Sequence, residues 1–398
     1  MLVRHPAARL ALALAILSTA LCAAPRPRRR RWKPPLTTIM YIVNQPDSIA
    51  SFVAHAGEVS IAAPQSFVLD AAGFVGGNIP DEVLAVARAR HVALMPLVTN
   101  RGFSQPLMRT LLDSRASRAR AIRYLIYLAR RDGDIGFQFD LEHIYYTYRR
   151  QYTEFFREAA IAFHRHHLIL SAAVVGRLPG ESVRSGPSGG FANWGGVYNY
   201  RGIARWANFL TLMAYPQHGG FSGPGAVAGY EWVHRMLAYA RARIPARKLS
   251  LGVPTYGEEW TPRAQLQLAA GDGHEPPGPA PAGWVVHGVS FSDVAALLAG
   301  PDPGGEAVTR HWDPASRSHY LLVPTADGAG QVWYADAASL RQELRLMRRY
   351  GVSSISAWRL GGEDPAIWPL LRREFRIRHP RPPRLAGSFN QRSRAAAG

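Results

Sequence analysis

Short apolar segments alternate with longer amphipathic segments from residue 37 to residue 361. Several of the apolar segments, such as ALMPLV and LILSAAVV, are hydrophobic at nearly every position. Such continuous runs are typical of parallel strands that are buried on both faces. The chain contains eight β-prone apolar runs, at residues 38–43, 59–63, 93–99, 136–142, 168–175, 209–215, 249–255 and 353–358.

Amphipathic segments that are long enough to form helices lie between these runs. We predict helices at residues 81–90, 116–131, 152–166, 203–208, 230–243 and 338–350. Eight strands that alternate with helices indicate an α/β fold, a closed (β/α)8 TIM barrel rather than an open sheet. In barrels of this kind the active site lies at the end where the strands finish.

One connection is longer than the others. Roughly 80 residues separate the seventh strand from the next predicted helix, and a structureless loop of that length is uncommon in a compact domain. The segment contains a short helical pattern at 291–300 and strand-like patterns at 307–312, 319–323 and 331–334. We therefore predict a small α+β insertion subdomain at about residues 258–337, between strand 7 and strand 8, on the catalytic face.

The most informative segment is IGFQFDLE at residues 135–142. Side chains alternate along a strand, so Gln138, Asp140 and Glu142 share one face, and the apolar residues between them share the other. Polar groups that face a barrel interior are unfavourable unless they serve a function. The segment is therefore predicted to carry catalytic carboxyl groups, and the alternative is an edge strand with solvated acids.

This segment resembles the fourth-strand signature of glycoside hydrolase family 18, the chitinase family. That signature is DxxDxDxE, in which the final Glu is the catalytic acid. Asp140 and Glu142 match its last two positions, whereas Gln138 replaces the middle acid and Ile135 replaces the first. Both departures leave the acid and its neighbouring aspartate in place.

Three further segments resemble the same family, so that the resemblance covers about residues 37–370. LMAY at 212–215 is similar to the sixth strand, with Pro216 in place of the usual acid. SAW at 356–358 is similar to the eighth strand, and LSLGVPTYG at 249–257 is similar to the seventh.

The resemblance implies a substrate-assisted glycosidase that needs no cofactor or metal. Glu142 would be the acid, Asp140 would orient the N–H of the sugar's acetamido group, and Tyr215 would donate to its carbonyl oxygen. The predicted substrate contacts are Gln138, Met213, Trp358, Asn100 and Gln217. For Met213 and Trp358 the alternative is a packing role in the core. The substrate is predicted to be an N-acetylated glycan, chitin-like or derived from peptidoglycan. A sugar-binding lectin with weak or lost catalysis is the alternative.

Most of the net positive charge and the single cysteine lie near the two ends of the chain. The net charge is +19, but 14 of those charges lie in residues 1–33 and 376–398, which contain no acid. A basic stretch of this kind is either a solvated tail or an adhesion site for an anionic cell wall or membrane, and nucleic-acid binding is not predicted. The single cysteine, Cys22, lies in a leader with a charged start and an apolar middle, so disulfides are not expected.

These features predict an exported protein of the cell envelope or outside, and we expect a monomer. Residues 1–24 would be a signal peptide, although lipidation at Cys22 is an open alternative. Residues 25–36 would form a basic linker rich in proline and arginine, residues 37–371 the barrel, and residues 372–398 a basic tail.

Overall fold

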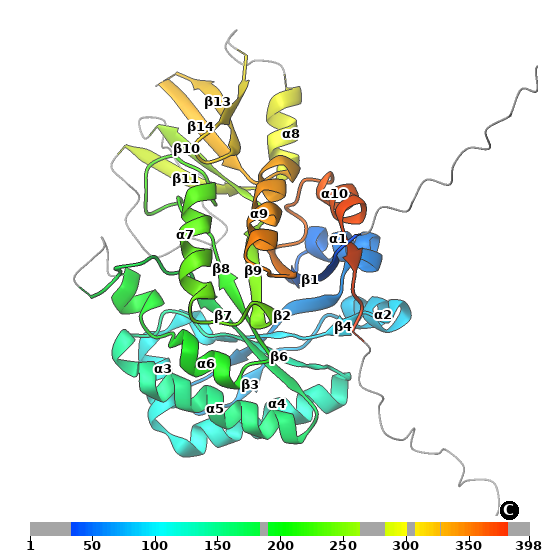
Figure 1. The fold of residues 1–398 in the computed structure, drawn as a ribbon, viewed down its shortest axis with the longest axis vertical. Helices are drawn as coiled ribbons and strands as arrows, with labels where there is room; N and C mark the ends of the chain where they lie inside the picture. Colours follow the sequence, from blue (N-terminus) through cyan, green and yellow to red (C-terminus); the bar gives the residue numbers. More distant parts are fainter. Residues whose placement is uncertain (1–32, 184–189, 263–282, 301–306, 327, 381–398) are drawn as a thin grey trace, which may run out of the picture. The chain divides into compact units, whose positions relative to one another are not determined.

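The computed structural model of the chain describes residues 33–183, 190–262, 283–300, 307–326 and 328–380. Its main feature is a closed ring of eight parallel strands, because β1 pairs with both β15 and β2 (Figure 1). All eight predicted strands are present, and the predicted barrel is confirmed. The strands are β1 (Pro35–Ile42), β2 (Ile61–Leu69), β4 (Ala93–Leu94) with β5 (Leu97–Asn100), β6 (Gly136–Asp140), β7 (Ile169–Val175), β8 (Phe209–Met213), β9 (Leu249–Pro254) and β15 (Ser354–Trp358).

The third strand is interrupted between β4 and β5. Pro96 lies in the gap, and a proline has no N–H to donate to a neighbouring strand. Its carbonyl oxygen still accepts a hydrogen bond from the N–H of Gln138 at 3.0 Å. A short strand, β3 (Val75–Gly76), pairs antiparallel with the end of β2.

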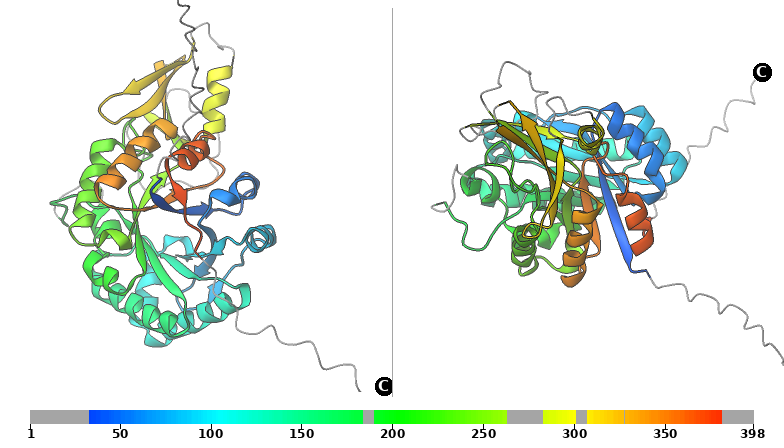
Figure 2. Two further views of the ribbon diagram at one scale, coloured as in Figure 1. Left: turned by 45° about the vertical axis from the view of Figure 1, so that its right-hand side comes forward. Right: turned by 90° about the horizontal axis from the view of Figure 1, so that it is seen from above.

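Helices lie outside the strands, as further views show (Figure 2). The six predicted helices are present as α2 (Asp81–Arg90), α4 (Arg115–Asp132), α5 (Arg149–Arg165), α6 (Tyr200–Trp206), α7 (Tyr230–Arg241) and α9 (Ala337–Arg349). Three more were not predicted: α1 (Pro46–His55), α3 (Gln105–Asp113) and α10 (Ile367–Glu374). Each is ten residues or shorter, so its periodic pattern is brief.

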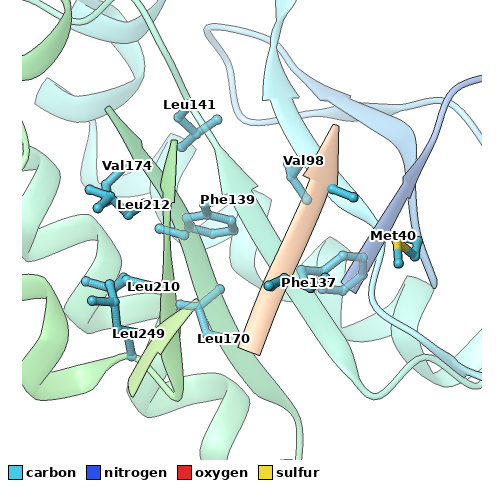
Figure 3. Close-up of a cluster of buried hydrophobic side chains, with 14 of the residues drawn as sticks. Met40, Val98, Phe137, Phe139, Leu141, Leu170, Val174, Leu210, Leu212 and Leu249 are labelled. Carbon is cyan, nitrogen blue, oxygen red and sulfur yellow. The ribbon is translucent and has the colours of Figure 1, made fainter. Parts of the chain in front are cut away.

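The two faces of β6 pack as the alternation predicts. Phe137 and Phe139 are fully buried between the strands and the helices, and Phe139 stacks on Phe155 of α5 with 5.4 Å between ring centroids. Figure 3 shows both rings, with Leu141, in one cluster with residues from neighbouring strands. Gln138 points the other way and forms hydrogen bonds with Tyr41 of β1 and with a side chain of β8 inside the barrel.

Between β9 and α9 the chain forms a separate five-stranded antiparallel sheet, in the order β11-β10-β14-β13-β12. Its elements are β10 (Gly257–Pro262), β11 (Trp284–Val289), α8 (Phe291–Ala299), β12 (Thr309–Asp313), β13 (Ser318–Thr325) and β14 (Gly328–Tyr334). A small core of its own contains Val294, Leu321 and Val332. Because β10 follows the C-terminal end of β9, the sheet is connected to the catalytic end of the barrel. Residues 263–282 of the predicted insertion lie outside the described residues.

The first strand of the barrel begins, and its last helix ends, slightly outside the predicted range of residues 37–371. Residues 35–36, assigned to the linker, belong to β1, and α10 continues to Glu374, inside the predicted tail. A last short strand, β16 (Arg376–Ile377), pairs with Pro35 and Leu36. Leu36 and Phe375 are buried, which holds this pair to the barrel. The predicted leader with Cys22 and most of both basic stretches lie outside the described residues. Within the described part, no helix has the length and apolar character that a membrane span requires.

Candidate active site

Two carboxyl groups meet at the end of β6. Asp140 is the last residue of the strand and is 5% exposed, and Glu142 follows two positions later. A hydrogen bond joins the two carboxyls. It lowers the pKa of Asp140 and raises that of Glu142, which favours a proton on Glu142 and a negative charge on Asp140.

Burial is the main cause of the unusual acidity of this pair. It raises the pKa of Asp140 to about 6. It also raises the pKa of Glu142 well above its ordinary value, and the negative charge of Asp140 adds to that effect. For Glu142, desolvation is a larger contribution than like-charge repulsion from Asp140. A carboxyl that keeps its proton near neutral pH can serve as a general acid.

Asn100 fixes the turn that carries Glu142. The backbone N–H of Glu142 donates to Asn100 Oδ1 at 2.9 Å, and Asn100 Nδ2 donates to the carbonyl oxygen of Glu142 at 3.1 Å. The hydroxyl of Tyr198 donates to the preceding carbonyl, that of Leu141, at 2.9 Å. Asn100 is 1% exposed, so its contact in this structure is with the acid-bearing turn. Its predicted contact with the sugar stays a prediction.

A chain of buried polar side chains crosses the barrel beneath the carboxyl pair. Tyr41 donates to Gln138 Oε1 at 2.6 Å, and Gln138 Nε2 donates to Thr211 Oγ1 at 2.9 Å. The chain continues through Ser356 to Ser250, with oxygen–oxygen distances of 2.9 and 2.7 Å. An amide suits this position because it accepts at one end and donates at the other, whereas an ionised carboxylate only accepts.

Gln138 is fully buried, and both ends of its amide are bonded to protein groups. This placement differs from the predicted substrate contact: Gln138 lies below the site and supports it. The misplacement follows from strand geometry, since the three polar residues of β6 share a face but lie at different depths in the barrel.

Tyr215 joins the carboxyl pair from β8, two residues after the strand ends. Burial raises the pKa of its phenol well above the ordinary value, with smaller contributions from neighbouring tyrosines and from the charges of Asp140 and Glu142. The charges of Asp140 and Glu142 thus reach the Tyr215 phenol, so the three predicted catalytic groups lie in the same region of the barrel end. Tyr215 packs edge-to-face on Tyr256, which follows β9, with 6.5 Å between ring centroids. A phenol that stays neutral can donate a hydrogen bond to substrate.

The remaining predicted contacts lie at the ends of three strands. Trp358 ends β15, is partly exposed, and lies 5.6 Å from the ring of Tyr41. Met213 ends β8 and is partly exposed. Gln217 Oε1 accepts from the N–H of Gly229, the residue that precedes α7, at 2.9 Å. Gln217 therefore ties the loop after β8 to that helix, and its contact with the sugar stays a prediction, as do those of Trp358 and Met213.

Sequence reasoning did not single out Tyr41, Tyr256 or Glu258. Tyr41 occupies an inward position of β1, a signal that the strand alternation could have provided. Glu258 lies in β10, where burial raises its pKa to about 7. No group of three or more His, Cys, Asp or Glu side chains suited to a metal ion occurs in the described part of the chain.

Several proteins resemble this chain in sequence or in fold. The chain is 28% identical over 299 residues to the cortical fragment-lytic enzyme of Bacillus subtilis, an alignment that spans 74% of this chain and 62% of that protein. The crystal structure of the spore cortex-lytic enzyme SleL of Bacillus megaterium superposes with a TM-score of 0.73 at 19% identity, over 88% of this chain and 76% of that one. A chitinase from Chromobacterium violaceum superposes with a TM-score of 0.71 at 22% identity, over 85% and 98% respectively.

A family model tests the sequence resemblance directly. The model for glycosyl hydrolases family 18 matches residues 64–363, which is well over half of the chain. The match begins in β2, ends after β15, and includes the Asp140–Glu142 pair. The chain therefore belongs to glycosyl hydrolases family 18 and is a glycosidase.

Proposed function

We propose that this chain hydrolyses β-1,4 bonds in glycans that contain N-acetylglucosamine, by a retaining mechanism in which the substrate's own acetamido group is the nucleophile. The observation that carries the proposal is the buried carboxyl pair at the end of β6, where burial and the charge of Asp140 raise the pKa of Glu142 well above its ordinary value. Substrate-assisted hydrolysis needs one acid and one group that steers the acetamide, and the pair supplies both.

In the first step Glu142 donates its proton to the glycosidic oxygen, and the acetamido oxygen attacks the anomeric carbon. The bond to the leaving sugar breaks and a cyclic oxazolinium intermediate forms. Asp140 accepts a hydrogen bond from the acetamide N–H, and Tyr215 donates one to its carbonyl oxygen. Water then attacks the anomeric carbon while Glu142 takes a proton from it, which restores the acid and retains the β configuration.

The proposed substrates are chitin-like oligomers and peptidoglycan. Two named relatives support this range: the cortical fragment-lytic enzyme of Bacillus subtilis and the Chromobacterium violaceum chitinase. Both polymers carry the 2-acetamido group that the mechanism requires. Trp358 supports the proposal because its partly exposed ring, at the end of a barrel strand, can pack on the apolar face of a sugar.

The test is hydrolysis of N-acetylglucosamine oligomers and peptidoglycan fragments, followed by mass spectrometry of the products, with wild type and Glu142→Gln. We expect the variant to lose about 10²–10⁴-fold in kcat and still to bind oligosaccharide. Glu82→Gln, on the exposed side of α2, serves as the matched control and should retain full turnover.

A lectin would give a different pattern. One solved structure with the same fold, at a TM-score of 0.66 and 14% identity, is described as a human pseudo-chitinase, YKL-39, with retained chitooligosaccharide binding. If wild type binds the oligomers without cleaving them, and Glu142→Gln binds them equally well, the lectin interpretation replaces the hydrolase.

We also propose that the protein is exported and that its basic ends adhere to an anionic cell wall or membrane. The support is the acid-free charge of residues 26–33 and 376–398. Removing residues 381–398, which leaves β16 intact, should lower retention on anionic envelope fractions without slowing turnover of soluble oligomers. Equal retention of the truncated and full chains would contradict this part of the proposal.

A further inference from the structure

A cavity of about 380 Å³ lies beside the turn that carries Glu142. Its walls come from the ends of β2, β3 and β5 and from the short 3-10 helix Arg101–Phe103 that follows β5. Its polar lining groups include the side chains of Gln65, Thr99, Asn100 and Arg101. Because β2 and β5 are parallel barrel strands, the cavity lies at the catalytic end of the barrel.

Two contacts fix one wall of this cavity to the acid. Asn100 binds both backbone groups of Glu142, as described above. His143, the next residue, donates from Nδ1 to the carbonyl oxygen of Phe103 at 2.8 Å. A group that enters the cavity therefore lies against a wall that is held directly to the catalytic turn. A glycan bound at Glu142 can place a substituent there.

The cavity has a positive charge that no protein group compensates. Arg101 is exposed, and its guanidinium makes no hydrogen bond, ion pair or ring contact with any residue that the structure describes. Gln65 is partly exposed, and its amide is equally free within those residues. The lining contains no Asp or Glu. A guanidinium in this state offers a planar pair of N–H donors that fits a carboxylate.

The backbone beside Arg101 leaves room for a ligand. A Cβ atom built on Gly76 or on Gly102 would meet no heavy atom within 4 Å. Both glycines line the cavity, so their surface is open to a bound group. Between them, the two glycines and the free side chains of Gln65 and Arg101 form a polar, uncrowded recess.

We propose that this recess binds a carboxylate substituent of the glycan through Arg101, and that the enzyme thereby prefers peptidoglycan-type strands to chitin. The inference rests on the proposed function and sharpens its substrate class. Chitin has no carboxylate. In peptidoglycan every second sugar carries a lactyl group, which is either a free carboxylate or the attachment point of a peptide with its own carboxylates. The recess recognises the carboxylate itself.

The experiment compares three soluble substrates: peptide-free peptidoglycan oligosaccharide with free lactyl carboxylates, the same oligosaccharide as its methyl ester, and strands that keep their peptides. For each, kcat/KM is measured with wild type, Arg101→Gln and Arg101→Lys. We expect Arg101→Gln to lower the ratio of kcat/KM for the free acid over the ester by about 5- to 50-fold, and Arg101→Lys to restore part of it. Arg123→Gln is the matched control, because Arg123 is also exposed and free but lies on the outer face of α4.

Other outcomes separate the sources of the carboxylate. A loss on the peptide-free acid identifies the lactyl group, and a loss confined to strands with peptides identifies a peptide carboxylate. An unchanged acid-to-ester ratio, together with no effect on peptide-bearing strands, overturns the inference. If wild type also cleaves the ester and N-acetylglucosamine oligomers in that case, the proposed function survives. If wild type cleaves none of these substrates, the proposed function itself fails, and the same variants are then compared by calorimetric binding of the free acid and the ester.

Discussion

The two faces of β6, a strand of five residues, have different roles. Phe137 and Phe139 face the helices and pack on the aromatic rings of α5, whereas Gln138 and Asp140 face the barrel interior and form hydrogen bonds. The first face stabilises the fold by removing apolar surface from water. The second keeps polar and ionisable groups away from water, which is unfavourable unless each has a partner.

The stability and the chemistry of the site therefore depend on different faces of β6. The outer face sets the position of the strand, and the inner face uses that fixed position to hold a proton between two carboxyls. Changes on the outer face should therefore appear mainly in the unfolding free energy. Changes on the inner face should appear mainly in turnover.

The largest effect is expected for Phe139→Ala. The ring is fully buried and contacts Phe155, Phe156 and Phe163, so its removal leaves a cavity. We expect a loss of about 3–5 kcal/mol in unfolding free energy by denaturant titration. At temperatures where the variant remains folded, its kcat should stay within a few-fold of wild type. A stable variant without activity would show that the two faces are not separable.

Asp140→Asn should produce the opposite pattern. The amide has the shape of the carboxylate but no negative charge. It is therefore a weaker acceptor for the hydrogen bonds from Glu142 and from the substrate acetamide. We expect kcat to fall by about 10²–10³-fold, and the unfolding free energy at pH 7 to be equal to or above that of wild type. Steady-state kinetics beside a denaturation curve gives both numbers. Turnover near the wild-type value would remove Asp140 from the proposed mechanism.

Asn100→Ala tests the contact that positions the acid. Loss of the amide frees both backbone groups of Glu142, so the turn should become less well placed. We expect kcat to fall about 10- to 100-fold with little change in KM, and a smaller loss of stability of about 1–3 kcal/mol. A rise in KM at constant kcat would instead indicate the substrate contact predicted from the sequence.

The pH dependence of stability tests the raised pKa of Asp140. The folded state binds more protons than the unfolded chain between the ordinary pKa of Asp140 and its raised value of about 6. Stability from this group is therefore complete below pH 4 and is lost as the pH rises through 6. Relative to the Asp140→Asn/Glu142→Gln double variant, wild type should lose about 3 kcal/mol across that range in thermal or denaturant unfolding. A parallel pH dependence of the two proteins would contradict the raised pKa.

The alternation of β6 was sufficient to predict its two faces, because a period of two is a local property of any strand. The eight barrel strands were predictable for a similar reason, since each is a short apolar run between longer amphipathic segments. The short helices α1, α3 and α10 were missed because ten residues or fewer give little periodic signal.

The sequence could not predict how deep a side chain lies in the barrel or which distant residue it contacts. Gln138 lies within β6 and Glu142 in the turn that follows it, so one is sealed beneath the site and the other is at its mouth. The role of Asn100 depends on a neighbouring strand 42 residues away in sequence. Glu258 lies in β10, whose partner strands β11 and β14 both follow it in the chain. Such relations arise from tertiary structure and have no local pattern.

The pairing of β16 with the start of β1 brings residues near both ends of the described chain together at one end of the barrel. The N–H of Arg376 donates to the carbonyl oxygen of Pro34 and that of Arg378 to the carbonyl oxygen of Leu36, so β16 runs parallel to the first residues of β1. These residues lie at the opposite end of the barrel from the carboxyl termini of its strands. Residues near both ends of the described chain therefore hold each other at the base of the barrel, so a truncation that removed β16 would also expose the start of β1.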